Sequence, residues 1–168
     1  DVKFFDDLNE NSADLYGVNL TNAEVSADLT GIRMSGSICN YAHFDEAILD
    51  DVNLSGSQMN NATLEGVSAE NTDFTEVHGT YLLFTSTFRN TTSLIGADFE
   101  DANLSGALFE LKGETSDAND NGRLDAVDFS GTSFRGATMV STRFQELNGE
   151  PPLFNGTNFA DANLSQAQ

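Results

Sequence analysis

A bulky apolar residue recurs at every fifth position along most of the chain. Between Leu29 and Leu164 this bulky register contains 28 positions, and 21 of them hold Leu, Phe or Met. These three residue types make up 33 of the 168 residues, so a random arrangement would place only about five or six of them there. The five-residue spacing is therefore a property that the fold must explain.

A second register, two residues before each bulky position, holds mostly small side chains, and the remaining positions are mainly Asp, Asn, Ser, Thr and Gly. A period of five matches neither the 3.6 residues of a helix nor the two of a simple strand. Two inward positions in every five residues predict a short straight segment that ends in a turn, with Asn, Asp and Gly supplying the turn conformations.

The units at residues 97–101 (ADFED), 102–106 (ANLSG) and 162–166 (ANLSQ) resemble the A(D/N)LXX motif of the pentapeptide-repeat family. The resemblance covers about residues 13–168 and implies an all-β fold, a right-handed quadrilateral parallel β-helix, as a single solenoid domain over 1–168. In such a fold each unit forms one face and four units form one coil. The chain would then have about seven to eight coils and a length on the order of 33 Å.

Three places depart from the repeat. One is near Gly149, where Pro151 and Pro152 predict a turn excursion. Leu15, Leu20 and Val25 run one residue out of phase with Leu29, which predicts a local slip near Ser26. The stretch 1–12 before them, which contains aromatic residues, is a candidate N-terminal cap.

Between residues 79 and 91 the bulky register holds Gly79 and Arg89. Because a buried charge is costly, a bulge or protruding loop is expected over 79–91. Tyr81 and Phe88 would then form an exposed contact patch; the alternative is that the chain repacks them inward.

The composition is strongly acidic, with 27 Asp and Glu against 7 Lys and Arg and a formal net charge of −20. This balance argues against nucleic-acid binding, which needs clustered cations, and against docking on anionic lipid. It is compatible with a solvated acidic surface, with cation binding, or with imitation of a polyanion. No apolar stretch is long enough to predict insertion into a membrane.

The segment 117–128 suits a metal ion. Counting from Asp117, oxygen-bearing side chains fall at positions 1, 3, 5, 9 and 12, and Gly122 stands at position 6, where the chain must turn sharply. The segment resembles the calcium loop of EF-hand and dockerin proteins, although position 12 is Asp instead of Glu and no flanking helices are evident. A polar turn without an ion is the alternative. The predicted Ca²⁺ ligands, within an insertion over 110–128, are Asp117, Asn119, Asn121, the Arg123 carbonyl, Asp125 and Asp128.

A loop of this kind favours a structural site for calcium at extracellular concentrations. Together with a chain that starts at Asp1 and not at Met, it predicts an extracellular, periplasmic or lumenal protein with a processed N-terminus. An artificial start is the alternative.

The sequence predicts no enzyme. Its two histidines, His43 and His78, precede bulky positions and should point outward, seven faces apart, where they cannot meet. The single cysteine, Cys39, lies in the bulky register and is expected to be a core residue.

Two functions compete. The first is a secreted, non-enzymatic scaffold stabilised by calcium, which binds a protein partner or associates with itself through its ends into filaments, because Leu164 and the last coil have no evident cap. The second is an acidic DNA mimic that binds DNA gyrase, as some pentapeptide-repeat proteins do.

Overall fold

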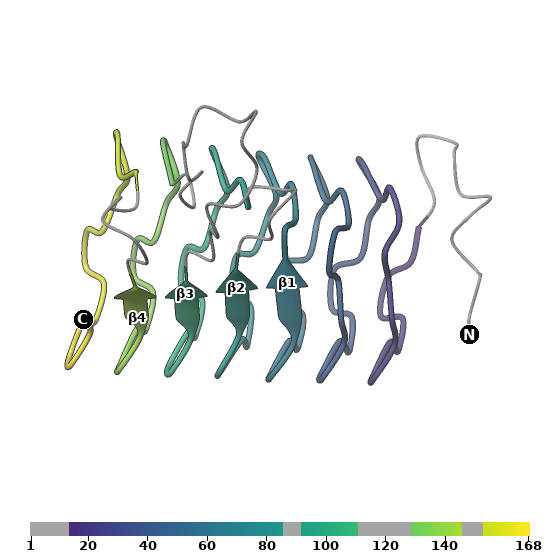
Figure 1. Cartoon of the computed structure of the whole chain (residues 1–168), viewed down its shortest axis with the longest axis horizontal. Coiled ribbons are helices and arrows are strands. Elements are labelled where there is room, and N and C mark those ends of the chain that lie inside the picture. The colour runs from purple at the N-terminus through teal and green to yellow at the C-terminus, as the bar shows by residue number, and fades with distance from the viewer. Residues whose placement is uncertain (1–13, 86–91, 111–128, 146–152) are drawn as a thin grey trace, which may run out of the picture.

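The computed structural model describes residues 14–85, 92–110, 129–145 and 153–168. These residues form a parallel β-helix whose coils stack along one axis (Figure 1). The described ranges contain no helix; they consist of short bridges and strands that alternate with turns. The predicted all-β solenoid is therefore confirmed.

Each regular coil contains four five-residue units. Parallel bridges join residues 20 positions apart, so a residue returns to the same face after four units. We number the faces by the first residue of each ladder of bridges: face 1 starts at Asp14, face 2 at Asn19, face 3 at Glu24 and face 4 at Asp28. The ladder of face 1 has seven levels, consistent with the predicted seven to eight coils; its members are Asp14, Arg33, Asn53, Asp73, Asp98, Ser133 and Asn158.

Face 3 contains the regular strands, β1 (Thr63–Glu65), β2 (Leu83–Thr85), β3 (Leu108–Glu110) and β4 (Arg143–Gln145). They form one parallel sheet in the order β1-β2-β3-β4, visible as the row of arrows in Figure 1. The register aligns Phe84, Phe109 and Phe144 along the sheet, so the bulky positions of successive coils lie directly above one another.

Three coils are longer than the others. Bridged residues are 25 positions apart between Ser68 and Ser93, 35 between Asp98 and Ser133, and 25 between Ser133 and Asn158. The additional residues follow β2, β3 and β4, in the segments 86–91, 111–128 and 146–152. Because each addition is a multiple of five residues, the register continues in phase after every segment.

The predicted slip near Ser26 is also confirmed. Glu24 bridges His43, 19 residues away, whereas Asp28 bridges Ile48, 20 residues away. One residue is therefore missing from the coil between these two bridges. The Ser26 hydroxyl donates a hydrogen bond of 2.7 Å to the Asp45 carbonyl at this point, which ties the shortened corner to the next coil.

The interior is filled by columns of bulky side chains. Ring centroids lie 4.6 Å apart between Phe74 and Phe99 and 5.0 Å apart between Phe99 and Phe134, with nearly parallel planes. Rings on opposite faces meet edge to face across the interior, as Phe84 of face 3 and Phe99 of face 1 do at 6.0 Å. Offset stacks and edge-to-face pairs are the preferred geometries of aromatic rings, so the coil spacing and the quadrilateral section both suit a phenylalanine core.

The corners are turns with one residue in the left-handed region, two positions after the bulky one. Gly occupies this place in ten units, and Asn, Asp, Glu, Tyr, Ser or Gln occupies it in twelve others. A hydrogen bond closes 21 of these 22 turns, as from the Ala47 amide to the Phe44 carbonyl at 3.0 Å. This arrangement is the type II turn, whose third residue needs a positive φ, and it accounts for the polar residues between the registers.

The structure corrects the expectation of a bulge that begins at residue 79. Residues 79–85 continue the coil, and Leu82 and Phe84 are fully buried. Leu82 occupies a small-register position and fills the space beside Gly79, where an added Cβ would lie 3.0 Å from its Cδ2 atom. Tyr81 is exposed as expected; Phe88 and Arg89 lie outside the described residues.

Cys39 is a core residue, as predicted. It is fully buried, and burial raises the pKa of its thiol to about 12 from an ordinary value of 9.0. At pH 8 the thiolate fraction should be about a thousandfold lower than in the unfolded chain. We expect a disulfide reagent to label the folded protein slowly and the urea-unfolded chain at once. Because the chain has one cysteine, the released chromophore reports on this thiol alone, and equal rates would contradict its burial.

Candidate functional surfaces

The outward side chains are ordered by hydrogen bonds within the turns. The Asp or Asn that precedes a bulky residue accepts a hydrogen bond from the backbone amide two residues later, as Asp73 does from Thr75 at 3.0 Å. In such an Asx turn the side-chain oxygen takes the place of a backbone carbonyl as the acceptor, which stabilises the turn conformation. At Asp28 the hydroxyl and the amide of Thr30 both donate to one carboxylate oxygen, and these bonds, the hydroxyl first, hold the pKa of Asp28 below its usual value.

A second set of hydrogen bonds connects successive coils. The Asp50 carboxylate accepts from the Glu70 amide at 2.9 Å and from the Ser68 hydroxyl at 2.7 Å. Asn40 accepts from the amide of Asn60 in the same way, 20 residues ahead. These contacts fix the surface side chains relative to one another along the axis of the solenoid.

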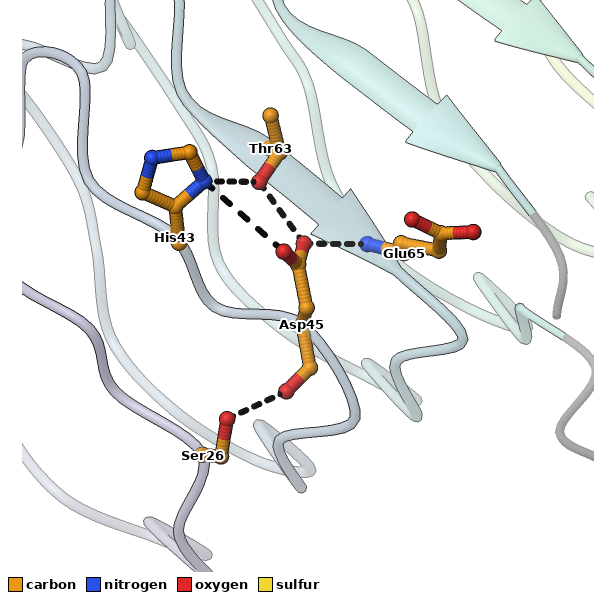
Figure 2. Close-up of polar contacts among 5 residues, drawn as sticks. All are labelled: Ser26, His43, Asp45, Thr63 and Glu65. Atoms are coloured by element: carbon orange, nitrogen blue, oxygen red, sulfur yellow. Dashed lines mark hydrogen bonds and ion pairs between the residues drawn. The ribbon is translucent and has the colours of Figure 1, made fainter.

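Figure 2 shows a polar cluster around Asp45 on face 3. The Asp45 carboxylate accepts hydrogen bonds from the Thr63 hydroxyl at 2.7 Å and from the Glu65 amide at 3.0 Å. The His43 Nδ1 atom lies 2.9 Å from the Thr63 hydroxyl oxygen and 3.7 Å from the carboxylate. His43 points outward, as expected, and His78 lies on the ladder of face 2.

This cluster contains a hydroxyl, an imidazole and a carboxylate, but it is not arranged for catalysis. In a triad the two ring nitrogens serve different partners: one faces the nucleophile and the other faces the acid. Here Thr63 and Asp45 both lie at Nδ1 of His43, and the Thr63 hydroxyl donates its proton to the carboxylate. The nearby Ser26 hydroxyl is bonded to a backbone carbonyl. The arrangement links two coils and orients the side chains between them.

Replacing Asp45 with alanine should lower the free energy of unfolding by about 1 kcal/mol, because the Glu65 amide and the Thr63 hydroxyl lose their shared acceptor. Urea denaturation measures the change. Asp45→Asn keeps a side-chain oxygen at the same place and should retain most of the stability. An equal loss in the two variants would mean that the charge, and not the acceptor, is what matters.

The acidic residues of the described ranges lie on three of the four faces. The described ranges contain 16 Asp and Glu and three Arg. Two of the arginines form exposed ion pairs on face 1, Arg33 with Asp14 and Arg135 with Glu100; exposed pairs of this kind contribute little to stability. Grouped by face, the acids are Asp14, Asp73, Glu76, Asp98, Glu100, Asp101 and Asp161 on face 1, Glu24, Asp45, Glu46, Glu65 and Glu110 on face 3, and Asp28, Asp50, Asp51 and Glu70 on face 4.

The predicted calcium ligands Asp117, Asn119, Asn121, Arg123, Asp125 and Asp128 lie outside the described residues. The candidate N-terminal cap over 1–12 lies outside them as well. Within the described ranges, no group of three or more His, Cys, Asp and Glu side chains could hold a metal ion. The metal prediction therefore depends on the sequence motif.

The last coil exposes apolar side chains that earlier coils bury. Phe154 and Leu164 are exposed by 38% and 42%, whereas Phe129 and Leu104 of the same columns are fully buried. Phe159 is partly buried and stacks on Phe134 at 5.2 Å. The end of the rod thus presents the same apolar columns that each coil offers to the next.

Among the described residues, no helix long and apolar enough to cross a membrane was found.

A scan against protein-family models matches residues 27–66 and 90–110 to the family described as pentapeptide repeats, in eight copies. None of the curated proteins compared with the chain gives a significant match.

The chain is also similar to solved structures of repeat proteins. A pentapeptide repeat protein from the Arabidopsis thaliana thylakoid lumen is 19% identical, with a TM-score of 0.56, and the match covers 72% of this chain and 70% of that one. HetL from the cyanobacterium Nostoc sp. strain PCC 7120 is 16% identical over 95% and 90% of the two chains, with a TM-score of 0.36. QnrB1, a plasmid-mediated fluoroquinolone resistance protein, is 13% identical over 92% and 78%, with a TM-score of 0.49. At 19% identity, the similarity to the Arabidopsis thaliana protein shows a shared fold and does not extend to function.

Proposed function

We propose that this chain, a parallel β-helix whose residues 27–66 and 90–110 match the pentapeptide-repeat model, is a non-enzymatic structural scaffold that acts by binding other macromolecules. The observation that carries the proposal is the division of the side chains between an apolar core and an ordered polar surface. The bulky register forms a continuous stacked core, and many outward polar groups are hydrogen bonded to their neighbours within or between coils. Such a surface is rigid and suited to recognition, and it offers no nucleophile paired with a base among the described residues.

The exposed apolar side chains of the last coil favour a scaffold that associates end to end. Phe154 and Leu164 would be buried by one more coil, which a second copy of the chain can supply. Burying these two side chains contributes about 1.5–3 kcal/mol each, because their apolar surface leaves water. Head-to-tail contacts do not close on themselves and therefore generate filaments.

Sedimentation velocity and negative-stain electron microscopy of the 168-residue chain test this association. We expect species longer than one solenoid, growing with protein concentration. The variant Leu164→Asp should remain a monomer, because it places a charge in the end contact, while Ile48→Asp, at an exposed apolar residue on face 4, should assemble normally. A strictly monomeric wild-type chain at high concentration would exclude filaments but leave lateral binding by the faces untouched.

We further propose that the scaffold binds Ca²⁺ through Asp117, Asn119, Asn121, the Arg123 carbonyl, Asp125 and Asp128, and that it works in an extracellular, periplasmic or lumenal compartment where calcium is abundant. The support is the spacing of oxygen ligands in the sequence. Calcium at millimolar concentration should raise the melting temperature, whereas the same concentration of magnesium should not. In the Asp117→Ala variant the calcium effect should disappear; persistence there would reject this ligand set.

The alternative is an acidic mimic of DNA that binds DNA gyrase. The excess of acidic residues over arginine on the described rod favours it, and the absence of charge from one face, described below, weighs against imitation of a uniformly charged duplex. A gyrase supercoiling assay distinguishes the two functions. Inhibition or protection of the enzyme at micromolar protein would support the mimic and argue against the scaffold.

A further inference from the structure

Face 2 has no formal charge. Its seven units, residues 18–22, 37–41, 57–61, 77–81, 102–106, 137–141 and 162–166, contain no Asp, Glu, Lys or Arg. Charged residues make up 20% of the chain, so 35 residues of average composition would contain about seven. In a protein with a net charge of −20, an entire uncharged side selects its partner by different chemistry from the other three faces.

Most outward side chains of this face are amides and hydroxyls, with Ile38, His78 and Val140 as exceptions, and several of the polar groups are already ordered. Asn40 accepts from the Asn60 amide at 3.0 Å and donates to Gln58 at 3.3 Å. Asn60 accepts in turn from the amide and the hydroxyl of Thr80. The chain of contacts spans three coils, and every member keeps further donor or acceptor capacity toward solvent. A ligand would therefore meet a regular polar surface at little cost in side-chain entropy.

Two exposed tyrosines stand along one edge of face 2. Tyr41 and Tyr81 are exposed by 54% and 68%. The Tyr41 amide donates to the Asn60 carbonyl and the Asn61 amide donates to the Thr80 carbonyl, which places residues 41, 61 and 81 at the same corner of successive coils. The tyrosines are thus two coils apart, about 9–10 Å. The Tyr81 ring packs on Gly106 of the next coil, where a Cβ added to the glycine would lie 2.7 Å from the Cδ1 and Cε1 atoms of the ring.

The dimensions of face 2 favour a long, thin ligand. Seven levels at the spacing of parallel strands give a length of about 29 Å, and a segment of about three extended residues gives a width of roughly 10 Å. The resulting area, about 300 Å², is well below the ~800 Å² that each partner buries in a stable protein–protein interface. A second copy or a globular partner is therefore poorly matched to this face, whereas one extended polymer chain laid along the axis would cover it.

We infer that face 2 binds an uncharged, extended polysaccharide, a β-linked glycan whose hydroxyl groups pair with the amide and hydroxyl ladder and whose sugar rings stack on Tyr41 and Tyr81. A polyanion is repelled by the net charge of the protein, and a polycation is drawn to the acidic faces 1, 3 and 4. The uncharged face thus remains for a neutral ligand. Sugar rings have apolar faces and polar edges, which tyrosine rings flanked by amides complement. This inference is independent of end-to-end association and of calcium.

Affinity electrophoresis of the full chain in native gels tests the inference. Hydroxyethyl cellulose and galactomannan are the neutral extended probes, dextran is a neutral probe that is not extended, and carboxymethyl cellulose is an anionic one. We expect one or both of the first two to slow the wild-type protein, with less effect from dextran and none from carboxymethyl cellulose.

The double variant Tyr41→Asn, Tyr81→Asn removes both rings while using a residue that already takes the same positive φ at Asn61. It should bind at least about tenfold more weakly, as truncation of aromatic anchors does elsewhere. The matched control is Tyr16→Asn, an exposed tyrosine on face 1, which should bind as the wild type does. Binding to neither extended probe, equal weakening in the control, or equal retention by carboxymethyl cellulose would each overturn the inference.

Discussion

Replacing Leu82 with alanine should lower the free energy of unfolding by about 2–5 kcal/mol, the range observed when a buried leucine is truncated. Leu82 is fully buried in a register that elsewhere holds mostly alanine or valine. It fills the space that Gly79 leaves empty in the bulky register of the adjoining face, so its removal would leave a cavity bordered by two small residues. Urea denaturation followed by circular dichroism measures the loss.

The same pair of positions provides its own control. Gly79→Leu alone should also destabilise the protein, because an added Cβ already lies 3.0 Å from Leu82 and overpacking costs about 1–3 kcal/mol. The double variant Gly79→Leu, Leu82→Ala restores the usual order of bulky and small residues. It should be within about 1 kcal/mol of the wild type. Additive losses would show that the two side chains do not share one space.

Replacing Phe99 with alanine should cost about 3–5 kcal/mol. Phe99 is fully buried, stacks between Phe74 and Phe134, and meets Phe84 edge to face. Truncation would interrupt a column in the middle of the solenoid, where each coil is stabilised mainly by its neighbours. The loss should therefore be accompanied by faster hydrogen exchange at amides of the adjoining coils, such as those of Phe74 and Phe134.

Phe99→Leu is the matched control, since leucine occupies the same register at Leu54 in an earlier coil of face 1. It should cost less than half as much as alanine. Phe159→Ala, at a partly buried ring of the last coil, should cost less than Phe99→Ala, because fewer neighbours are lost. If all three variants lost equal stability, the central columns would not be the main source of it.

The five-residue period was sufficient to predict the fold, because it decides which side chains point inward. Leu104 and Phe129 are buried as the period requires, and the slip near Ser26 could be located from the phase of Val25 and Leu29 alone. Turn residues such as Asn61 were also recognisable, since few other types accept a positive φ.

The same period misplaced the start of the irregular region. Gly79 breaks the bulky register, and each register considered separately predicts a bulge there. In the structure the interior volume is shared between adjoining faces, so a large residue at 82 compensates for a missing side chain at 79. Only the two registers read together could have shown this.

The uncharged face was missed for a related reason. A five-residue period separates inside from outside, but it does not assign a residue to one of four sides. That assignment needs the 20-residue coil together with the slip at Ser26 and the additions after β2, β3 and β4. Once the units are aligned in this way, Asn19, Asn40, Asn60, Thr80 and Asn103 come onto one side and the acids onto the other three.

The central claim is that the faces of this solenoid carry different recognition chemistry. A series of single charges within one coil tests it most directly: Gly56→Asp on face 1, Asn61→Asp on face 2 and Asn71→Asp on face 4. All three positions have a positive φ between 54° and 66°, a conformation that Asp51 and Asp101 already adopt. In gels containing hydroxyethyl cellulose or galactomannan, only Asn61→Asp should lose its retardation, while the other two variants migrate as the wild type does. Equal behaviour of the three variants would contradict a division of the surface by face.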